Sequence, residues 1–118
     1  MRKRILIAED EETARETLAN IARMRGYDVI TVANGVDLLA IAAKERFDIV
    51  ITDLMMKDLD GASAAKIMKM QGNITPVIAL TGVSADDVQI VQDSFTRIFS
   101  KPVDISRLFQ YVETLIGN

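Results

Sequence analysis

The sequence predicts a doubly wound α/β fold, in which helices cover both faces of a five-stranded parallel sheet. Five short apolar runs, rich in β-branched residues, alternate with five longer segments of helical periodicity. The run 48–52 (DIVIT) is apolar without strict alternation, as expected of a strand that is buried on both faces. In a chain of 118 residues these features predict a (βα)5 three-layer sandwich with strand order 2-1-3-4-5.

The elements follow one another along the chain as strand–helix pairs. The apolar runs predict strands at 4–8, 28–32, 48–52, 76–80 and 97–100, and the periodic segments predict helices at 13–25, 35–45, 62–71, 85–94 and 104–116. Gly26 is a natural stop for the first helix. Its apolar residues fall mostly on one face, namely Ala14, Leu18, Ile21, Ala22 and Met24. The inner side of the last helix is predicted to carry Leu108, Phe109, Val112, Leu115 and Ile116.

Length and composition predict a single domain over residues 1–118, without an effector domain. With 49% hydrophobic residues, 6 Gly and 2 Pro, the chain can form one compact core. No apolar run is long enough to span a membrane, and the apolar stretch after the basic start Arg2-Lys3-Arg4 is too short for a signal peptide. We therefore expect a soluble, cytoplasmic protein that does not bind membranes.

Charge and residue types exclude several classes of function. The 17 acidic and 14 basic side chains give a net charge of -3, and the Lys and Arg residues are scattered, which argues against nucleic acid as a direct partner. The chain has no Cys and no His, so disulfides, thiolate and imidazole chemistry and the usual zinc ligands are excluded. Any chemistry must use carboxylates, hydroxyls and amines.

Polar residues stand where four of the predicted strands end. Glu9 and Asp10 end the first strand, Asp53 the third, Thr81 the fourth and Lys101 the fifth. In a 2-1-3-4-5 sheet these ends meet at the crevice where ligands bind. Each residue also has an ordinary structural explanation, such as Asp10 as a helix N-cap. Three carboxylates held together, however, repel one another and must lose ionisation or recruit a cation.

The clustered carboxylates predict a magnesium site and a phosphoryl acceptor. Mg2+ prefers one or two carboxylates, a carbonyl oxygen and several waters, which fits Asp10, Asp53 and the backbone oxygen of Met55. A rigidly held carboxylate beside Mg2+ and the Lys101 ammonium can attack a phosphoryl group and form an aspartyl phosphate. Asp53 is the predicted nucleophile, and the Thr81 hydroxyl, one strand over, is predicted to hydrogen-bond a phosphoryl oxygen.

The motifs, in this order, resemble the receiver domain family of bacterial response regulators, which has the flavodoxin-like (CheY-like) architecture. The resemblance extends from Ile5 to the last helix. It is carried by the segments 5–11 (ILIAEDE), 51–56 (ITDLMM), 60–61 (DG), 76–82 (PVIALTG) and 100–102 (SKP).

The resemblance implies a role for each residue at the strand ends. Asp53 would be the phospho-acceptor, Asp10 a direct metal ligand, Glu9 an acidic residue acting mainly through water, Thr81 the switch hydroxyl, and Lys101, before a cis bond to Pro102, the phosphate partner. Mg2+ is the implied cofactor. Apart from its own phosphoryl transfer and slow autodephosphorylation, the domain would not be an enzyme.

The resemblance also implies the partners. The phosphoryl donor would be a histidine kinase or a histidine phosphotransfer protein of a two-component system or phosphorelay. The output would pass to an effector domain or protein through the face formed by the predicted helix 85–94, the strand 97–100 and the helix 104–116. The domain is expected to be a monomer, and dimerisation on phosphorylation is left open.

Two of the departures from the family pattern concern the switch and the hydrolysis of the phosphoryl group. Ile98 stands where the family usually places Tyr or Phe, and the neighbouring Phe99 points to the opposite face of its strand. We expect Phe99 in the core and Ile98 at the switch position, so that Thr81 moves on phosphorylation while the aromatic half of the relay is muted. Met55 and Val83 are apolar where many relatives position attacking water, which implies slow phosphoryl hydrolysis.

Other interpretations fit less of the sequence. The stretch 58–61 (DLDG) spells the start of a haloacid-dehalogenase-type phosphatase motif, but no hydrophobic strand directly precedes it. An EF-hand loop containing this stretch would close at Ile67 instead of an acid. A flavodoxin-like FMN site would place its phosphate against the acidic run 9–12, which repels anions. A receiver-like interaction module that accepts no phosphate is the first alternative.

Overall fold

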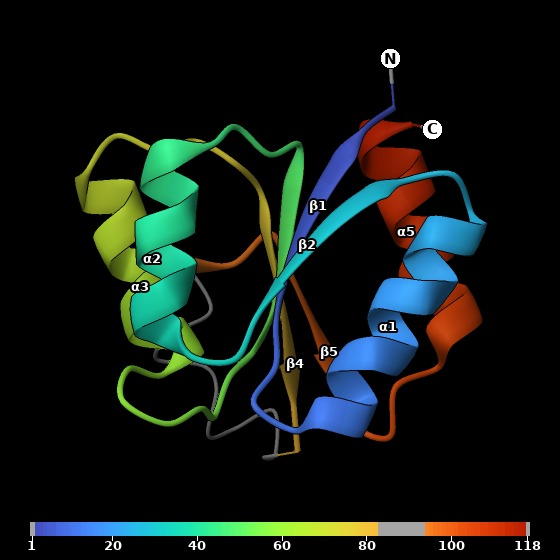
Figure 1. Ribbon diagram of the computed structural model, residues 1–118, viewed down its shortest axis with the longest axis horizontal. Helices are drawn as coiled ribbons and strands as arrows, with labels where there is room; N and C mark the ends of the chain where they lie inside the picture. Colours follow the sequence, from blue (N-terminus) through green and yellow to red (C-terminus); the bar gives the residue numbers. More distant parts are fainter. Residues whose placement is uncertain (1, 83–93, 118) are drawn as a thin grey trace.

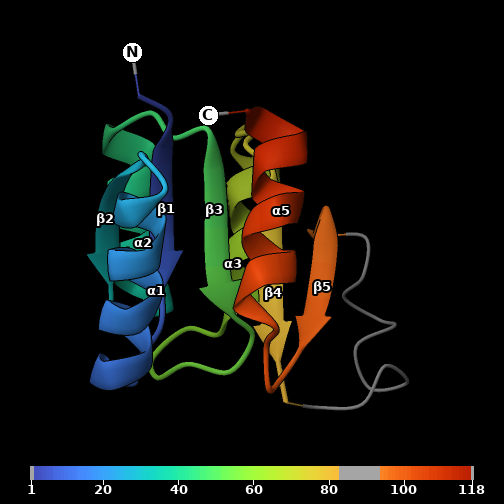
Figure 2. The same ribbon diagram turned by 90° about the vertical axis from the view of Figure 1, so that its right-hand side faces the viewer.

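The computed structural model describes residues 2–82 and 94–117, which form one parallel sheet between two layers of helices (Figure 1). The strands are β1 (Arg4–Ala8), β2 (Asp28–Val32), β3 (Ile49–Asp53), β4 (Val77–Thr81) and β5 (Arg97–Ser100). The helices are α1 (Glu12–Met24), α2 (Gly35–Lys44), α3 (Gly61–Met70) and α5 (Ile105–Ile116). The strand order is β2-β1-β3-β4-β5, and Figure 2 shows the strands running in one direction. The predicted fold class is confirmed.

Each face of the sheet has its own hydrophobic core, because successive strand residues point to opposite faces. On one face, Ile7 and Ile51 pack in a cluster with residues of α1 and α5. On the other, Leu6 and Val50 pack with residues of α2 and α3, and Figure 1 shows these two helix layers on either side of the sheet. Since both faces are covered, the central strands are apolar almost throughout, which accounts for their lack of alternation.

The predicted boundaries agree with the structure to within about two residues, as usual for helix and strand ends. Strands β3 and β4 end at Asp53 and Thr81, so both polar residues belong to rigid strands. The predicted helix 85–94 lies outside the described residues except for Ser94, and Val83 lies outside them as well.

Two helical residues that were predicted on the inner, apolar face are more exposed than expected. The prediction for Met24 was wrong, because this residue is 85% exposed. Met24 lies two positions from the buried Ala22, about 200° around the helix. Leu115, near the end of α5, is also partly exposed, at 39%.

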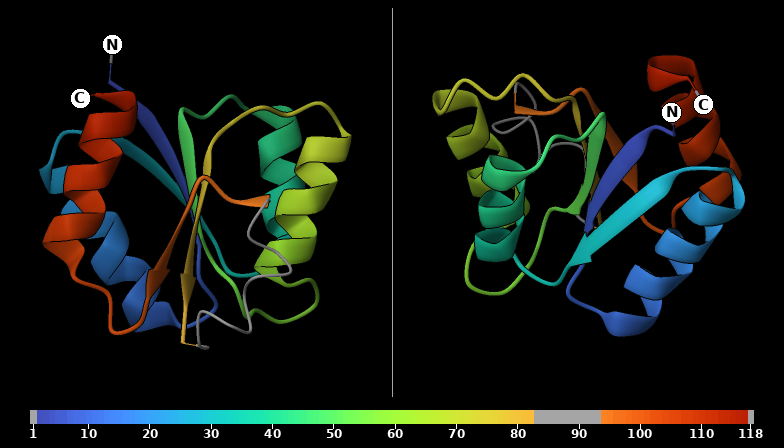
Figure 3. Two further views of the ribbon diagram at one scale, coloured as in Figure 1. Left: turned by 180° about the vertical axis from the view of Figure 1, so that it is seen from behind. Right: turned by 45° about the horizontal axis from the view of Figure 1, so that its top comes forward.

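Strand β5 lies at one edge of the sheet, with α5 on one side and α3 on the other (Figure 3). Ile98 packs against the cluster of α2 and α3, and Phe99 packs against the cluster of α1 and α5. The two side chains therefore point to opposite faces, as predicted. Phe99 is only partly buried, however, and its ring meets that of Tyr111 edge to face at 5.9 Å.

The carboxyl ends of the strands lie together at the lower edge in Figure 1, away from both ends of the chain. The loops that follow the strands therefore gather at this edge, which is where ligands bind in open parallel sheets. Within the described ranges, none of the helices has the length and apolarity needed to cross a bilayer.

Candidate functional site

Three carboxylates meet at the carboxyl ends of the adjacent strands β1 and β3. Glu9, Asp10 and Asp53 can each place one oxygen within 4.8 Å of the other two. Glu9 and Asp53 are only 3% and 5% exposed, whereas Asp10 is exposed. Two buried carboxylates this close together are costly unless a cation balances them. The structure thus brings together the acidic residues that the sequence singled out.

Lys101 supplies one positive charge from the other side of the cluster. Its Nζ donates a hydrogen bond to Asp53 Oδ2 at 2.6 Å and lies 3.5 Å from Glu9 Oε1. Its backbone N–H donates to the carbonyl of Thr81 at 2.7 Å, which continues the pairing of β5 with β4. The Lys101–Pro102 bond is cis, the isomer that the resemblance implies. The end of β5 therefore directs the lysine at Asp53.

The ionisable groups of the cluster shift one another's pKa values. Burial raises the pKa of Glu9, and the neighbouring Asp53 raises it further, against the opposing effects of the Glu11 N–H and of Lys101. Burial alone would lower the pKa of Lys101, but the hydrogen bond and charge of Asp53, with the charge of Glu9, raise it overall. Lys101 therefore remains positive, and the ionised form of Glu9 is disfavoured in the absence of another cation.

Replacing Glu9 with Gln is expected to stabilise the metal-free protein near pH 7. The pKa of Glu9 is higher in the folded than in the unfolded state, so its ionised form destabilises the fold at neutral pH. This penalty disappears as the pH falls through the raised pKa toward the ordinary value of 4.5. Urea unfolding of both proteins near pH 7 and pH 4.5 measures the difference. A gain that is absent near pH 7, or that is equal at both pH values, would contradict the expectation.

The remaining predicted residues lie around this cluster. Thr81 is 1% exposed and follows Leu80, the residue of β4 that pairs with Asp53. The backbone N–H of Met55 donates to Asp53 Oδ1 at 3.3 Å, and its side chain is 65% exposed. Ile98 is partly buried and packs against the hydrophobic cluster that includes residues of α2 and α3.

Glu11, and not Asp10, is the N-cap of α1. The Glu11 carboxylate accepts hydrogen bonds from the N–H groups of Thr13 and Ala14 at 3.2 and 2.6 Å. The N-terminal positive end of the helix favours a carboxylate there. Asp10 is consequently not used in helix capping, and its carboxylate is exposed at the site.

Two residues that support the site were not anticipated from the sequence. The buried Thr52 hydroxyl donates to the carbonyl of Asp53 at 2.9 Å. Arg15 Nη1 donates to the carbonyl of Glu9 at 3.0 Å. A hydroxyl in an otherwise apolar strand was a visible signal for Thr52. Arg15 gave no signal, because its reach depends on how α1 packs beside β1.

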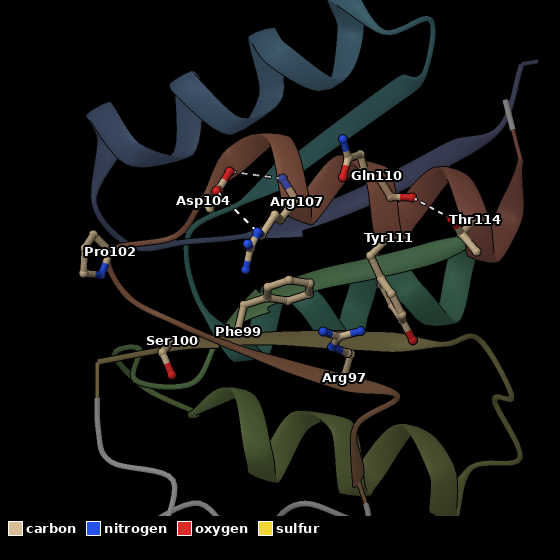
Figure 4. Close-up of a pocket in the computed structure, with 9 residues that line it drawn as sticks. All are labelled: Arg97, Phe99, Ser100, Pro102, Asp104, Arg107, Gln110, Tyr111 and Thr114. Carbon is tan, nitrogen blue, oxygen red and sulfur yellow. Dashed lines mark hydrogen bonds and ion pairs between the residues drawn. The ribbon is translucent and has the colours of Figure 1, made fainter.

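Two hollows lie near Lys101 and Pro102. The first is mainly apolar and lies beside Glu9 and Lys101; its other lining residues include Leu18, Leu80, Val103 and Ile105. The second, on the outside of β5 and α5, is shown in Figure 4. There the Arg97 guanidinium lies against the rings of Phe99 and Tyr111, at 5.1 and 4.9 Å from their centroids. Both hollows are lined in part by Pro102, the residue that follows Lys101.

The chain is similar to one protein family and to several known proteins. The model of the response regulator receiver domain family matches residues 5–113. The polar-differentiation response regulator DivK of Brucella anthropi is 26% identical, over 100% of this chain and 99% of DivK. The transcription factor SKN7 of Saccharomyces cerevisiae is 32% identical over 83% of this chain. That match spans only 16% of SKN7.

Solved structures share the fold over nearly the whole chain. The receiver domain of the Francisella response regulator 1452 is 26% identical with a TM-score of 0.93, covering 98% of this chain and 97% of that one. TrrA of Thermotoga maritima, in complex with Mg2+–BeF, is 26% identical with a TM-score of 0.88, covering 96% and 98%. The receiver domain of the Pseudomonas aeruginosa sensor histidine kinase PA1611, with a magnesium ion in its active-site cleft, is 28% identical with a TM-score of 0.89, covering 100% of both chains.

Proposed function

The chain belongs to the response regulator receiver domain family, and on that premise we propose that it is a phosphorylation-activated receiver of a two-component system or phosphorelay. The observation that carries the proposal is the position of Asp53. Its carboxylate ends a buried strand, is held by Lys101 and the Met55 N–H, and lies beside two further carboxylates. A carboxylate held in this way is a rigid nucleophile with a fixed positive charge next to it.

In the proposed reaction, Asp53 attacks the phosphorus of a phosphohistidine, and the bond from phosphorus to the histidine nitrogen breaks. The product is an aspartyl phosphate. Lys101, already 2.6 Å from Asp53, then pairs with a phosphoryl oxygen. We assign the second phosphoryl contact to the hydroxyl of Thr81, which is buried at the end of the adjacent strand β4. The domain thereby acts as a signalling module and not as an enzyme with an external substrate.

The residues present fit Mg2+ as the cofactor. The donor set is entirely oxygen, two of the three carboxylates are buried, and Lys101 is the one cation paired with them among the described residues. Asp10, Asp53 and a backbone oxygen at Met55 would hold the ion, and Glu9 would contact it mainly through water. When bound, Mg2+ would offset the negative charge of the phosphoryl oxygens. The magnesium-bound receiver of PA1611 and the Mg2+–BeF complex of TrrA support this assignment.

The proposed partners differ for the two hollows. A histidine kinase or phosphotransfer protein must bring its phosphohistidine to Asp53, and the apolar hollow beside Glu9 and Lys101 offers a surface for the apolar side chains of that partner. The effector would bind the face that includes β5 and α5, where Arg97 and Arg107 line the second hollow (Figure 4). This chain matches nearly all of DivK but a small part of SKN7, so an effector could lie on a separate protein or on the same one.

The proposal predicts that the protein gains the mass of one phosphoryl group when incubated with acetyl phosphate and Mg2+. The gain should disappear when EDTA removes the metal, because Asp53 then faces the phosphoryl charge with Lys101 alone. Intact-protein mass spectrometry measures both results. No gain with Mg2+ present would favour the alternative of an interaction module that accepts no phosphate.

The phosphoryl group is expected to be hydrolysed slowly. The exposed, apolar Met55 offers no polar group to orient water, so the added mass should persist. Loss within seconds would contradict slow hydrolysis.

Phosphorylation is expected to move Thr81 with little response from Phe99, the aromatic residue of β5. The position facing the core of α2 and α3 is Ile98, and Phe99 is held on the opposite face against Tyr111. Structures of the protein with and without Mg2+ and beryllofluoride test this expectation. A large rotation of Phe99 with Ile98 unchanged would show that the aromatic relay runs through Phe99 instead.

A further inference from the structure

Asp10 differs from the other two carboxylates in how it is held. Glu9 and Asp53 are buried and paired with Lys101, whereas Asp10 is exposed and forms no hydrogen bond or ion pair with the residues that the structure describes. Its carboxylate can nevertheless reach within 4.8 Å of the others. The orientation of the Asp10 side chain must therefore be set by the backbone of Asp10, which is fixed by the residues on either side of it.

Both neighbours of Asp10 are fixed by hydrogen bonds. The N–H of Glu9 donates to the carbonyl of Val32 at 3.1 Å, which continues the pairing of β1 with β2. The N–H of Glu11 donates to Glu9 Oε2 at 3.2 Å, and the Glu11 carboxylate caps α1. One backbone group in this stretch, the carbonyl of Glu9, lies beyond the last residue of β1 and points to a side chain instead of a strand.

Arg15 binds that carbonyl. Its Nη1 donates to the Glu9 oxygen at 3.0 Å from the first turns of α1, and the residue is partly buried. The oxygen belongs to the peptide group that joins Glu9 to Asp10. This hydrogen bond therefore fixes the orientation of the peptide plane that precedes the Cα of Asp10. A guanidinium donor makes the bond stronger than a neutral donor would. A side chain of α1 thus binds the backbone of the acidic segment that precedes the helix.

We infer that Arg15 is a positioning residue that directs Asp10 toward the magnesium site. The inference rests on the proposed function, since it concerns the same site. The positive charge of Arg15 has the opposite effect, because a guanidinium near the carboxylates repels a second cation. Loss of positioning weakens Mg2+ binding, and loss of charge strengthens it. The two roles of Arg15 therefore predict opposite signs for the same substitution.

The test is the Mg2+ affinity of Arg15→Gln, compared with Arg23→Gln. Arg23 is on the same helix, eight residues or about 12 Å further along, is exposed, and also contacts a carbonyl, that of Val29, at 3.5 Å. Both variants lose one positive charge. Titration of the 15N-labelled full chain with MgCl2, followed by NMR, gives the dissociation constants and shows that each variant is folded.

We expect Arg15→Gln to bind Mg2+ about 10-fold more weakly than the parent, the lower end of the effect of residues that orient metal ligands. Arg23→Gln should match the parent. In metal-free protein, the amide signals of Asp10 and Glu11 should shift in Arg15→Gln and stay in place in Arg23→Gln, which a general loss of stability would not produce. Affinity of Arg15→Gln equal to or tighter than that of the parent would overturn the inference.

The parent titration separates this inference from the proposed function. If the parent binds no Mg2+, the proposed magnesium-dependent reaction is wrong, and the role of Arg15 fails with it. If the parent binds Mg2+ and is phosphorylated but Arg15→Gln behaves like the parent, only the role of Arg15 is wrong.

Discussion

Replacing Asp53 with Asn should abolish phosphoryl acceptance, whereas replacing Asp58 with Asn should leave it unchanged. The amide introduced by Asp53→Asn is nearly the same shape as the carboxylate and can still accept the Met55 N–H, but it is not a nucleophile toward phosphorus. Asp58 is exposed in the loop between β3 and α3 and has a positive φ of 68°. It follows no strand directly, so nothing holds its carboxylate toward a phosphoryl group as the end of β3 holds Asp53.

The pair of variants also decides between two aspartyl-phosphate chemistries. In a phosphatase that used the stretch 58–61, Asp58 would be the nucleophile, and Asp58→Asn would be the inactive protein. The measurement is the mass gain with acetyl phosphate and Mg2+, with unfolding curves to show that both variants are folded. Phosphorylation that survives Asp53→Asn would place the acceptor on another carboxylate, with Asp10 and Glu9 the next to replace.

The fold and the site residues could be predicted because both depend on patterns local to the chain. Apolar runs such as 48–52 specify strands buried on both faces, and parallel strands bring their carboxyl ends to one edge. Asp53 and Thr81 therefore had to lie near each other once the strand order was known. The opposite facing of Ile98 and Phe99 followed in the same way from the alternation of side chains along a strand.

The contacts that were missed depend on three-dimensional packing. Asp10 and Glu11 are both acceptable helix caps in sequence, and only the path of the chain from β1 into α1 selects Glu11. The bond from Arg15 to the Glu9 carbonyl spans six residues and depends on the angle at which α1 lies beside β1. Partial exposure of Phe99 reflects its place on an edge strand, because no further strand extends the sheet past β5 among the described residues.

Replacing Gly61 with Ala should destabilise the protein by about 2 to 4 kcal/mol, the upper range for a substitution that overfills a packed site. Gly61 is the first residue of α3, and its N–H donates to the carbonyl of Leu54 at 2.9 Å. A Cβ at this position would lie 2.2 Å from the carbonyl oxygen of Asp53 and 3.1 Å from the Thr52 hydroxyl oxygen. The nearest obstacle is backbone and not the flexible end of a side chain, so either α3 or the end of β3 has to move.

The sign of this effect is informative, because Ala is a better helix former than Gly by about 1 kcal/mol and would stabilise α3 if there were room for it. Gly82→Ala is the control, since a Cβ there meets no atom of the described residues within 4 Å, and it should change stability by less than about 0.5 kcal/mol. Urea unfolding measures both variants. Because the obstructing carbonyl belongs to Asp53, folded Gly61→Ala protein should also bind Mg2+ more weakly. A Gly61→Ala variant as stable as Gly82→Ala would mean that the loop after β3 yields easily, and that Asp53 is held by Lys101 more than by the packing of α3.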